Sequence, residues 1–208
     1  MKKRFKISSQ KDHVTWMPMT DMLSSTLMIT FLFIAVSTIL RAMNAKPPII
    51  SLEDTEDYRF RTGSFILSQN FEDTLKAKAI PNIESTIKCY GIDTIEIVGH
   101  TDGRPSTPGG NIDMALVKGF EAKDMSKVMP GSNIDLGFLR AMAVQDKISN
   151  ILTKRGVNNI GFRVLSAGST INIDGRFSPA KNKDDKARRR IEIRFLRRSK
   201  TPFIPKCS

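Results

Sequence analysis

The sequence predicts an α+β protein in which a single transmembrane helix precedes a domain built on a mixed sheet with helices packed on one face. Two observations lead to this class. Residues 22–40 contain no charged side chain. After residue 58, short segments with the two-residue period of strands are interspersed with segments of helical period. Their order, which is strand, helix, strand, helix, strand, strand, is typical of a mixed sheet covered by helices.

The amino-terminal apolar segment is predicted to form a transmembrane helix over residues 14–43. At a rise of ~1.5 Å per residue, residues 22–40 alone approach the ~30 Å thickness of a bilayer core. A cleaved signal peptide is the alternative, but its apolar region is typically shorter, and the stretch "IAVSTILRAMNA" offers only a poor cleavage site. We therefore expect an uncleaved anchor.

Flanking charge predicts the orientation of this helix. The basic residues that precede it are Lys2, Lys3, Arg4, Lys6 and Lys11. Only Arg41 and Lys46 follow it closely, and an acidic stretch comes soon after. The positive-inside rule therefore places residues 1–13 in the cytoplasm as a basic tail. In a bacterial cell this makes an inner-membrane protein, with residues 44–57 as a linker and residues 58–208 as a periplasmic domain.

One carboxylate, Asp21, lies just inside the start of the apolar segment. It is either a residue at the level of the lipid headgroups, where an acid stabilises a helix amino terminus, or a carboxylate that faces a partner helix or a water-filled gap and binds a proton or cation. An ionised Asp facing lipid at mid-span costs about 2.5 to 3.5 kcal/mol on insertion scales. Ion binding is the functional hypothesis, and the helix-end role stays open.

Composition limits the other functions. The chain has 208 residues and a net charge of +12, which favours an anionic partner such as nucleic acid, lipid headgroups or an acidic polymer. Export disfavours direct nucleic-acid binding. Cys89 and Cys207 have no metal-ligand spacing, so no metal site is expected, and whether they form a disulfide is open. No catalytic triad, phosphate-binding loop or metal cluster is recognisable, so we expect neither enzyme activity nor a cofactor.

Strands and helices divide the exported part. We expect four strands, at residues 58–67, 94–100, 160–168 and 188–196. We expect two long helices, at residues 71–91 and 132–156. The first of them is interrupted or restarted at Pro81 and stopped by Gly91. Between Gly103 and Ser132 the chain is too long for a plain connection, so we expect a short helix there near residues 114–123.

Two features of these segments have structural interpretations. In the last strand, charged side chains alternate with apolar ones, and the face that carries them is interpreted as the solvated side of a sheet. These charged residues are Arg188, Arg190, Glu192 and Arg194. His100 has no nearby Cys or second His, so a hydrogen-bonded loop or core histidine is favoured over a metal ligand.

Three spaced motifs resemble a known family. They are "GHTD" at Gly99–Asp102, the pattern Asn133-x-x-Leu136-x-x-x-Arg140-Ala141-x-x-Val144 and "RRIEI" at Arg189–Ile193. In this order and on these elements, they resemble the OmpA-like peptidoglycan-binding domain found in OmpA, Pal and MotB. With one span that carries an acid near its cytoplasmic end, the whole chain resembles a MotB-type stator subunit. The stretch "TDMLSSTLMITFLFI" is similar to the MotB-like subunits of Zorya antiphage defence systems.

The resemblance implies a peptidoglycan-binding site. Asp102 and Arg140 would hold the free amino and carboxylate ends of the diamino acid in the peptidoglycan stem, since a carboxylate accepts hydrogen bonds from an ammonium and a guanidinium grips a carboxylate. Asn133 and the backbone around Gly99 and Thr101 would complete the pocket. An internal salt bridge between Asp102 and Arg140 is the alternative.

The chain departs from the family pattern at three places. Gly137 stands where the family usually has Ser, and Arg188 stands where it usually has an Asn that borders the ligand. The insertion before Asn133 changes the rim of the pocket.

The resemblance also implies partners and a mechanism. A homodimer would sit within a pentameric ring of a MotA-like membrane partner, with its periplasmic domains anchored to peptidoglycan. Protons or sodium ions would load and unload Asp21, and the ring would turn around the anchored dimer. In an antiphage system, phage damage to the envelope would trigger this motor. The alternatives are a passive inner-membrane tether and a flagellar-type MotB stator subunit.

Overall fold

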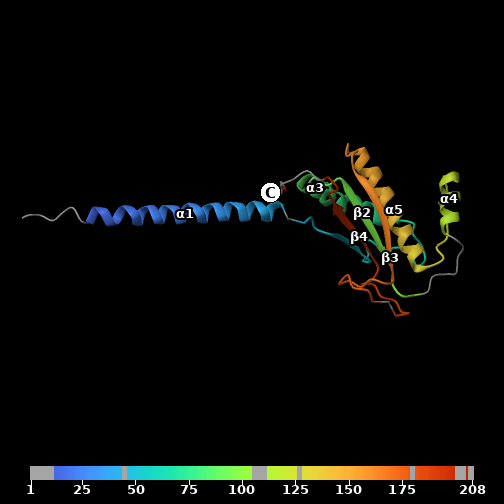
Figure 1. Cartoon of the computed structure of the whole chain (residues 1–208). Helices are drawn as coiled ribbons and strands as arrows, with labels where there is room; N and C mark the ends of the chain where they lie inside the picture. Colours follow the sequence, from blue (N-terminus) through green and yellow to red (C-terminus); the bar gives the residue numbers. More distant parts are fainter. Residues whose placement is uncertain are drawn as a thin grey trace, which may run out of the picture. The chain divides into compact units, whose positions relative to one another are not determined.

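The computed structural model in Figure 1 describes residues 12–43, 46–104, 112–125, 128–178, 181–199 and 205, with the side chains of the first helix described for residues 19–40. The chain divides into two compact units between residues 45 and 46. Within the described residues, the first unit holds one helix and the second holds an α+β domain.

Helix α1 spans Asp12–Met43, close to the predicted limits of 14 and 43. Its segment Met19–Leu40 has a mean hydropathy of 2.1 and is long and apolar enough to cross a membrane. Several of its hydroxyl side chains donate to carbonyls of the same helix, as Thr38 does to Ala35 at 2.8 Å. Such bonds suit a lipid environment, because no water is available there to satisfy polar groups.

The domain is built on a four-stranded sheet with the order β1-β4-β2-β3. The strands are β1 Ile50–Glu53, β2 Thr94–His100, β3 Gly161–Gly168 and β4 Arg190–Leu196. β2 and β3 run parallel, whereas β4 runs antiparallel to both β1 and β2. The predicted mixed sheet is therefore confirmed, as is the order of strands and helices along the chain.

The position predicted for the first strand is wrong. Residues 58–67 form turns and irregular backbone, and the first strand is β1, inside the segment 44–57 that was predicted to be a linker. In β1, Leu52 is buried and pairs with Ile191 of β4. The strand is short and runs directly into the acidic stretch "EDTEDY", so its alternation is weak in the sequence.

The segment 58–67 packs over the core as a loop. The ring of Phe71 lies 5.3 Å from that of Tyr58 and 5.0 Å from that of Phe60, centroid to centroid. The carbonyls of Arg61 and Ser64 accept hydrogen bonds from a side chain of a helix rather than from a neighbouring strand. The aromatic residues that gave this segment its strand-like alternation therefore anchor a loop.

A continuous helical stretch follows, consisting of α2 (Gln69–Thr74), a π-helical turn η1 (Leu75–Ala79) and α3 (Ile80–Tyr90). Pro81 has no N–H to donate and its ring crowds the preceding turn, so the chain accommodates it by widening that turn. The amide of Ile80 accordingly donates to the carbonyl of Leu75, five residues back. The predicted interruption is a widened turn, and the predicted stop at Gly91 is confirmed by its left-handed φ of 60°.

Helix α5, Asn133–Lys154, packs on β2 and β3. Ser132 caps its amino terminus, because the Ser132 hydroxyl accepts a hydrogen bond from the amide of Asp135 at 3.2 Å. The buried face of α5 joins one cluster with the stretch from α2 to α3 and with one face of the sheet. This core includes Phe71, Ile83, Ile95, Ile97, Val144, Ile148, Leu152, Ile191 and Ile193. The helices therefore cover one face of the sheet, as predicted.

The long connection between β2 and α5 carries the short helix α4, Ile112–Ala122, near the predicted residues 114–123. Figure 1 draws it in yellow-green. Met114, Val117 and Phe120 are exposed large apolar residues on this helix.

The opposite face of the sheet carries charged side chains, but it is not the solvated surface that was predicted. Glu192 of β4 is 9% exposed and forms ion pairs of 2.7 Å with both Arg190 and Arg194. His100 is 1% exposed, a core histidine as predicted, and its Nε2 lies 3.3 Å from Oε1 of Glu192. Contact with His100, and then with the two arginines, holds the pKa of Glu192 well below its ordinary value. Arg190 and Glu192 are therefore buried and paired, while the more exposed Arg194 pairs with Glu192 from the edge of this face.

Helix α5 approaches β2 most closely where two glycines meet. A Cβ added to Gly99 would lie 1.9 Å from the carbonyl oxygen of Gly137, and a Cβ added to Gly137 would lie 2.5 Å from Oγ of Ser166. Gly99 and Gly137 therefore set the spacing between helix and sheet. Because a serine at position 137 would overlap Ser166, the departure at this position is a packing feature.

We predict that Gly99→Ala destabilises the domain by about 2 to 3 kcal/mol, because the new methyl group meets backbone that has to shift. Chemical denaturation of the full chain in detergent measures this change. The matched control is Gly161→Ala at the start of β3, where the nearest atom to an added Cβ is 3.6 Å away. Equal stability of the two variants would contradict the account.

Candidate functional site

The topology of the sheet brings charged residues together at one end. β1 and β2 end there, and β4, which runs antiparallel to both, begins there. Asp54 directly follows β1, Asp102 lies two residues after β2, and Arg189 directly precedes β4. The strand order therefore places one arginine between two aspartates that are distant in the sequence.

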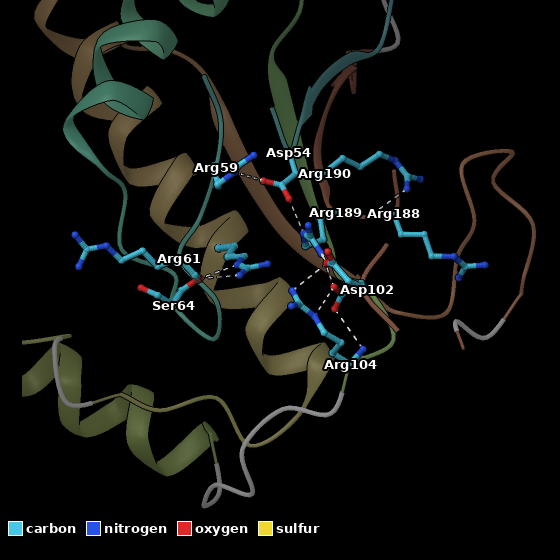
Figure 2. Close-up of polar contacts among 11 residues, drawn as sticks. Asp54, Arg59, Arg61, Ser64, Asp102, Arg104, Arg188, Arg189 and Arg190 are labelled. Carbon is cyan, nitrogen blue, oxygen red and sulfur yellow. Dashed lines mark hydrogen bonds and ion pairs between the residues drawn. The ribbon is translucent and has the colours of Figure 1, made fainter. Parts of the chain in front are cut away.

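Arg189 contacts three carboxylates. Figure 2 shows it between Asp54 and Asp102. Its Nε donates to Oδ2 of Asp54 at 2.6 Å, and its Nη1 donates to Oδ2 of Asp102 at 2.5 Å and to Oδ1 of Asp184. Burial lowers the pKa of Arg189, but the hydrogen bonds to these aspartates outweigh burial and raise the pKa above its ordinary value. Arg189 is a fixed cation at the centre of the cluster.

A second arginine, Arg104, also holds Asp102. Its Nε donates to Oδ2 of Asp102 at 2.9 Å, and its backbone N–H donates to Oδ1 at 3.3 Å. Its Nη2 lies 3.3 Å from Oδ1 of Asp184. Asp102 is 5% exposed, whereas the side chain of Arg104 is 38% exposed. Arg104 therefore forms the outer cover of a buried carboxylate.

Arg140 projects from α5 and holds the loop 58–67. Its Nε donates to the carbonyl of Ser64 at 2.9 Å and its Nη2 to that of Arg61 at 3.3 Å, and its guanidinium lies 4.8 Å from the centre of the Phe60 ring. It is 4% exposed. Burial, followed by the neighbouring charge of Arg189, lowers the pKa of Arg140 to about 10.

Arg140 forms no ion pair with a carboxylate among the described residues. The alternative of an internal salt bridge with Asp102 is therefore not what the structure shows, since Asp102 pairs with Arg189 and Arg104 instead. Asp102 is still close enough to act on Arg140 electrostatically. In the described part of the chain, the direct partners of this buried guanidinium are two carbonyls and a ring, so it is suited to receive an anion.

A small cavity of about 20 Å³ lies beside these residues. Asp54, His100, Arg140 and Arg189 are among the residues that line it. One oxygen of Asp54 and both ring nitrogens of His100 are buried and make no hydrogen bond to described residues. The volume suits about one water molecule, so a larger ligand has to displace side chains to enter.

The other predicted site residues are Asn133, Thr101 and Gly99, and each makes contacts within the domain. Asn133 donates through Nδ2 to the carbonyl of Arg104 at 2.9 Å and so fixes the loop after Asp102. The amide of Thr101 donates to the carbonyl of Gly168 at 2.9 Å, and its side chain is buried. Gly99 lies at the contact between β2 and α5 described above. These residues position Asp102 rather than surround an open pocket.

Arg188 points away from this cluster in Figure 2. Its Nη1 donates to the carbonyl of Ser178 at 2.6 Å and to that of Ser169 at 3.3 Å. It therefore fixes the connection between β3 and β4, and does not border Asp102.

The cluster contains residues that sequence reasoning missed. Asp54 lies in the segment predicted to be a linker, and Arg189 belongs to the motif "RRIEI", from which no role in the site follows. The usable signal is an acid directly after one strand and a basic residue directly before another. That signal needs the strand order, which the sequence does not contain.

The remaining predicted features lie elsewhere. Asp21 belongs to α1 and therefore to the other unit. Cys89, one of the two cysteines, lies in the last turn of α3, and Cys207 lies outside the described residues. Among the described residues, no group of three or more His, Cys, Asp or Glu side chains is arranged to hold a metal ion.

Of the known proteins compared with this chain, solved structures show similarity to it. No family model matches the chain, and no curated protein matches it. The periplasmic domain of MotB from Helicobacter pylori is 20% identical, with a TM-score of 0.47, over 74% of this chain and 78% of that one. The peptidoglycan-associated lipoprotein from Burkholderia pseudomallei is 18% identical, with a TM-score of 0.39, over 70% and 89%. The cell wall anchor of the T6SS from Pseudomonas aeruginosa is 17% identical, with a TM-score of 0.40, over 72% and 81%.

We predict that Arg189→Gln lowers the free energy of unfolding by about 3 kcal/mol at neutral pH, because buried carboxylates lose their shared cation. The loss should shrink as the pH falls below about 4. Hydrogen bonds and charges from arginines lower the pKa of Asp184, so its stabilising contribution is present above its ordinary pKa of 3.8 and is lost on acidification.

Urea denaturation at several pH values measures this effect. The control is Arg163→Gln on β3, whose side chain is 53% exposed and should lose less than about 1 kcal/mol. If the two variants lost the same stability at pH 7, the central role of Arg189 would be wrong.

Proposed function

We propose that this chain anchors the inner membrane of a bacterium to peptidoglycan, with its amino terminus in the cytoplasm and its α+β domain in the periplasm. The observation that carries the proposal is that two buried groups of opposite charge, Asp102 and Arg140, lie at one end of the sheet without pairing with each other. Asp102 is a carboxylate neutralised by Arg189 and by the half-buried Arg104, and Arg140 is a cation without a carboxylate partner among the described residues. Such a site complements a ligand that carries an ammonium and a carboxylate.

The diamino acid of a peptidoglycan stem has this chemistry. Its ammonium donates to Asp102, and its carboxylate accepts from Arg140 in a charge-assisted, bidentate geometry. A carboxylate beside Arg140 favours the charged guanidinium, which burial disfavours in the free protein. Ligand binding therefore relieves an unfavourable electrostatic interaction of the folded domain.

For the membrane half, we propose an ion-driven motor. Asp21 of a homodimer binds and releases H⁺ or Na⁺ within a pentameric ring of a MotA-like partner. One charge that crosses the membrane supplies about 2.3 kcal/mol per 100 mV. The anchored periplasmic domains hold the dimer while the ring turns, and in an antiphage defence system this rotation signals envelope damage. The resemblance of the span to MotB-like subunits of Zorya systems favours this use over a flagellar stator.

A passive tether is the second candidate. The domain alone supports it, because binding of peptidoglycan requires no ion flow. In a tether, Asp21 is a helix-end residue and its charge is dispensable.

We predict that Asp102→Asn weakens binding to purified sacculi by about 10-fold to 100-fold, because the ligand ammonium loses a charged acceptor. The measurement is co-sedimentation of the detergent-solubilised full chain with increasing amounts of sacculi. Asp146→Asn on the exposed side of α5 is the control and should bind as the wild type does. Unaltered binding by the Asp102 variant would exclude this site.

We predict that Asp21→Asn abolishes protection in a phage-plating assay with the MotA-like partner co-expressed, because the uncharged amide cannot be loaded with an ion. Membrane fractionation should show equal accumulation of variant and wild type. Thr38→Val, at the other end of the span, should retain protection. Full protection by the Asp21 variant would favour the passive tether.

A further inference from the structure

Asp102 is not free to receive a ligand in the described state. Its Oδ2 accepts from Arg189 at 2.5 Å and from Arg104 at 2.9 Å, and its Oδ1 accepts from the backbone of Arg104 at 3.3 Å. Only 5% of the residue is exposed. A ligand ammonium therefore has to replace one of the two guanidinium groups.

The contacts decide which of the two can leave. The side chain of Arg189 is 13% exposed and also donates to Asp54, so moving it would leave two buried carboxylates, Asp54 and Asp102, without this cation. The side chain of Arg104 is 38% exposed. Its only other ion-pair partner among the described residues is Asp184, whose side chain is 53% exposed. Arg104 can therefore turn outward at a much smaller cost.

We propose that Arg104 is a displaceable cover on Asp102, and that binding is an exchange of cations in which the ligand ammonium replaces the Arg104 guanidinium. This inference rests on the proposed function. Asp184 has a side chain that is 53% exposed, and it keeps hold of Arg104 after the exchange, since their atoms are already 3.3 Å apart. The backbone of Arg104 stays in place, because Asn133 donates to its carbonyl at 2.9 Å.

The exchange restricts the class of ligand. A ligand that displaces Arg104 without bringing a cation leaves the buried carboxylate of Asp102 with one neutralising cation fewer, which is unfavourable in free energy. The ligand therefore needs a free primary ammonium, and an N-acetylated stem should not bind. The ligand cannot bind Asp102 while the Arg104 side chain covers it. The apparent affinity for the ligand is therefore the intrinsic affinity multiplied by the fraction of protein in which Arg104 is turned outward.

The test compares binding of detergent-solubilised full chain to sacculi whose stems carry meso-diaminopimelate. Arg104→Gln removes the competing cation and should bind about threefold to tenfold more tightly than wild type. Arg104→Lys keeps a competing cation and should stay near the wild-type affinity. Arg176→Gln, in an exposed turn, is the matched control and should have no effect. Thermal denaturation establishes that each variant is folded.

A second variant tests the outward position of Arg104. Asp184→Asn should weaken binding in the wild-type background, because the displaced guanidinium loses its partner on the rim. In the Arg104→Gln background the same change should have little effect, since no guanidinium is left to move.

The outcomes separate this inference from the function on which it rests. If the wild type fails to bind sacculi, or binds them regardless of Asp102, the proposed function and the exchange both fail. If binding depends on Asp102 but Arg104→Gln binds equally or more weakly, the exchange alone is overturned. Competition by free diaminopimelate, and not by its N-acetylated form, supports the requirement for an ammonium.

Discussion

The shared hydrogen bonds of one guanidinium, that of Arg189, hold the functional end of the domain together. Arg189 joins Asp54 after β1 and Asp102 after β2 to the start of β4, so three strand ends are connected by one cation. A buried carboxylate at Asp102 is tolerable because this cation neutralises it. In the proposed function, this arrangement keeps an acceptor for a ligand ammonium inside the domain without an open cleft, and the half-buried Arg104 covers that acceptor.

The packing of α5 against β2 determines where Arg140 lies in the domain. The close contact of Gly99 with Gly137 brings α5 against β2, and Arg140 extends from the next turn of that helix beneath the loop 58–67. Arg140 donates hydrogen bonds to carbonyls of that loop, and among the described residues it pairs with no carboxylate. In the proposed motor, anchoring would be the task of the α+β unit and ion transfer the task of the helical unit, and the anchor would hold Asp21 stationary against a moving ring.

Much of the fold was predictable because local signals were strong. The helical period of α5 and the apolar positions of β2 and β4 reflect side chains that pack in the core, whereas the stop at Gly91 reflects the left-handed backbone that glycine adopts easily. The predicted position of the first strand is wrong for two reasons. β1 has only four residues, which is too short to show a clear alternation. Tyr58 and Phe60 alternate with charged residues as in a strand, but their rings pack on Phe71 from a loop. For the site, a resemblance located Asp102 and Arg140, but their partners depend on strand order. Arg189 and Asp102 are 87 residues apart, and no local pattern connects them.

In the proposed exchange, the ligand ammonium displaces Arg104 while Arg189 stays in place. The most direct measurement is the solvent exchange of arginine Nε–H protons by NMR, on the full chain in detergent, during titration with a muropeptide that carries meso-diaminopimelate. We predict that exchange at Arg104 becomes faster on saturation, while exchange at Arg189 stays slow. A protected Arg104 at saturation, or loss of protection at Arg189, would contradict the account.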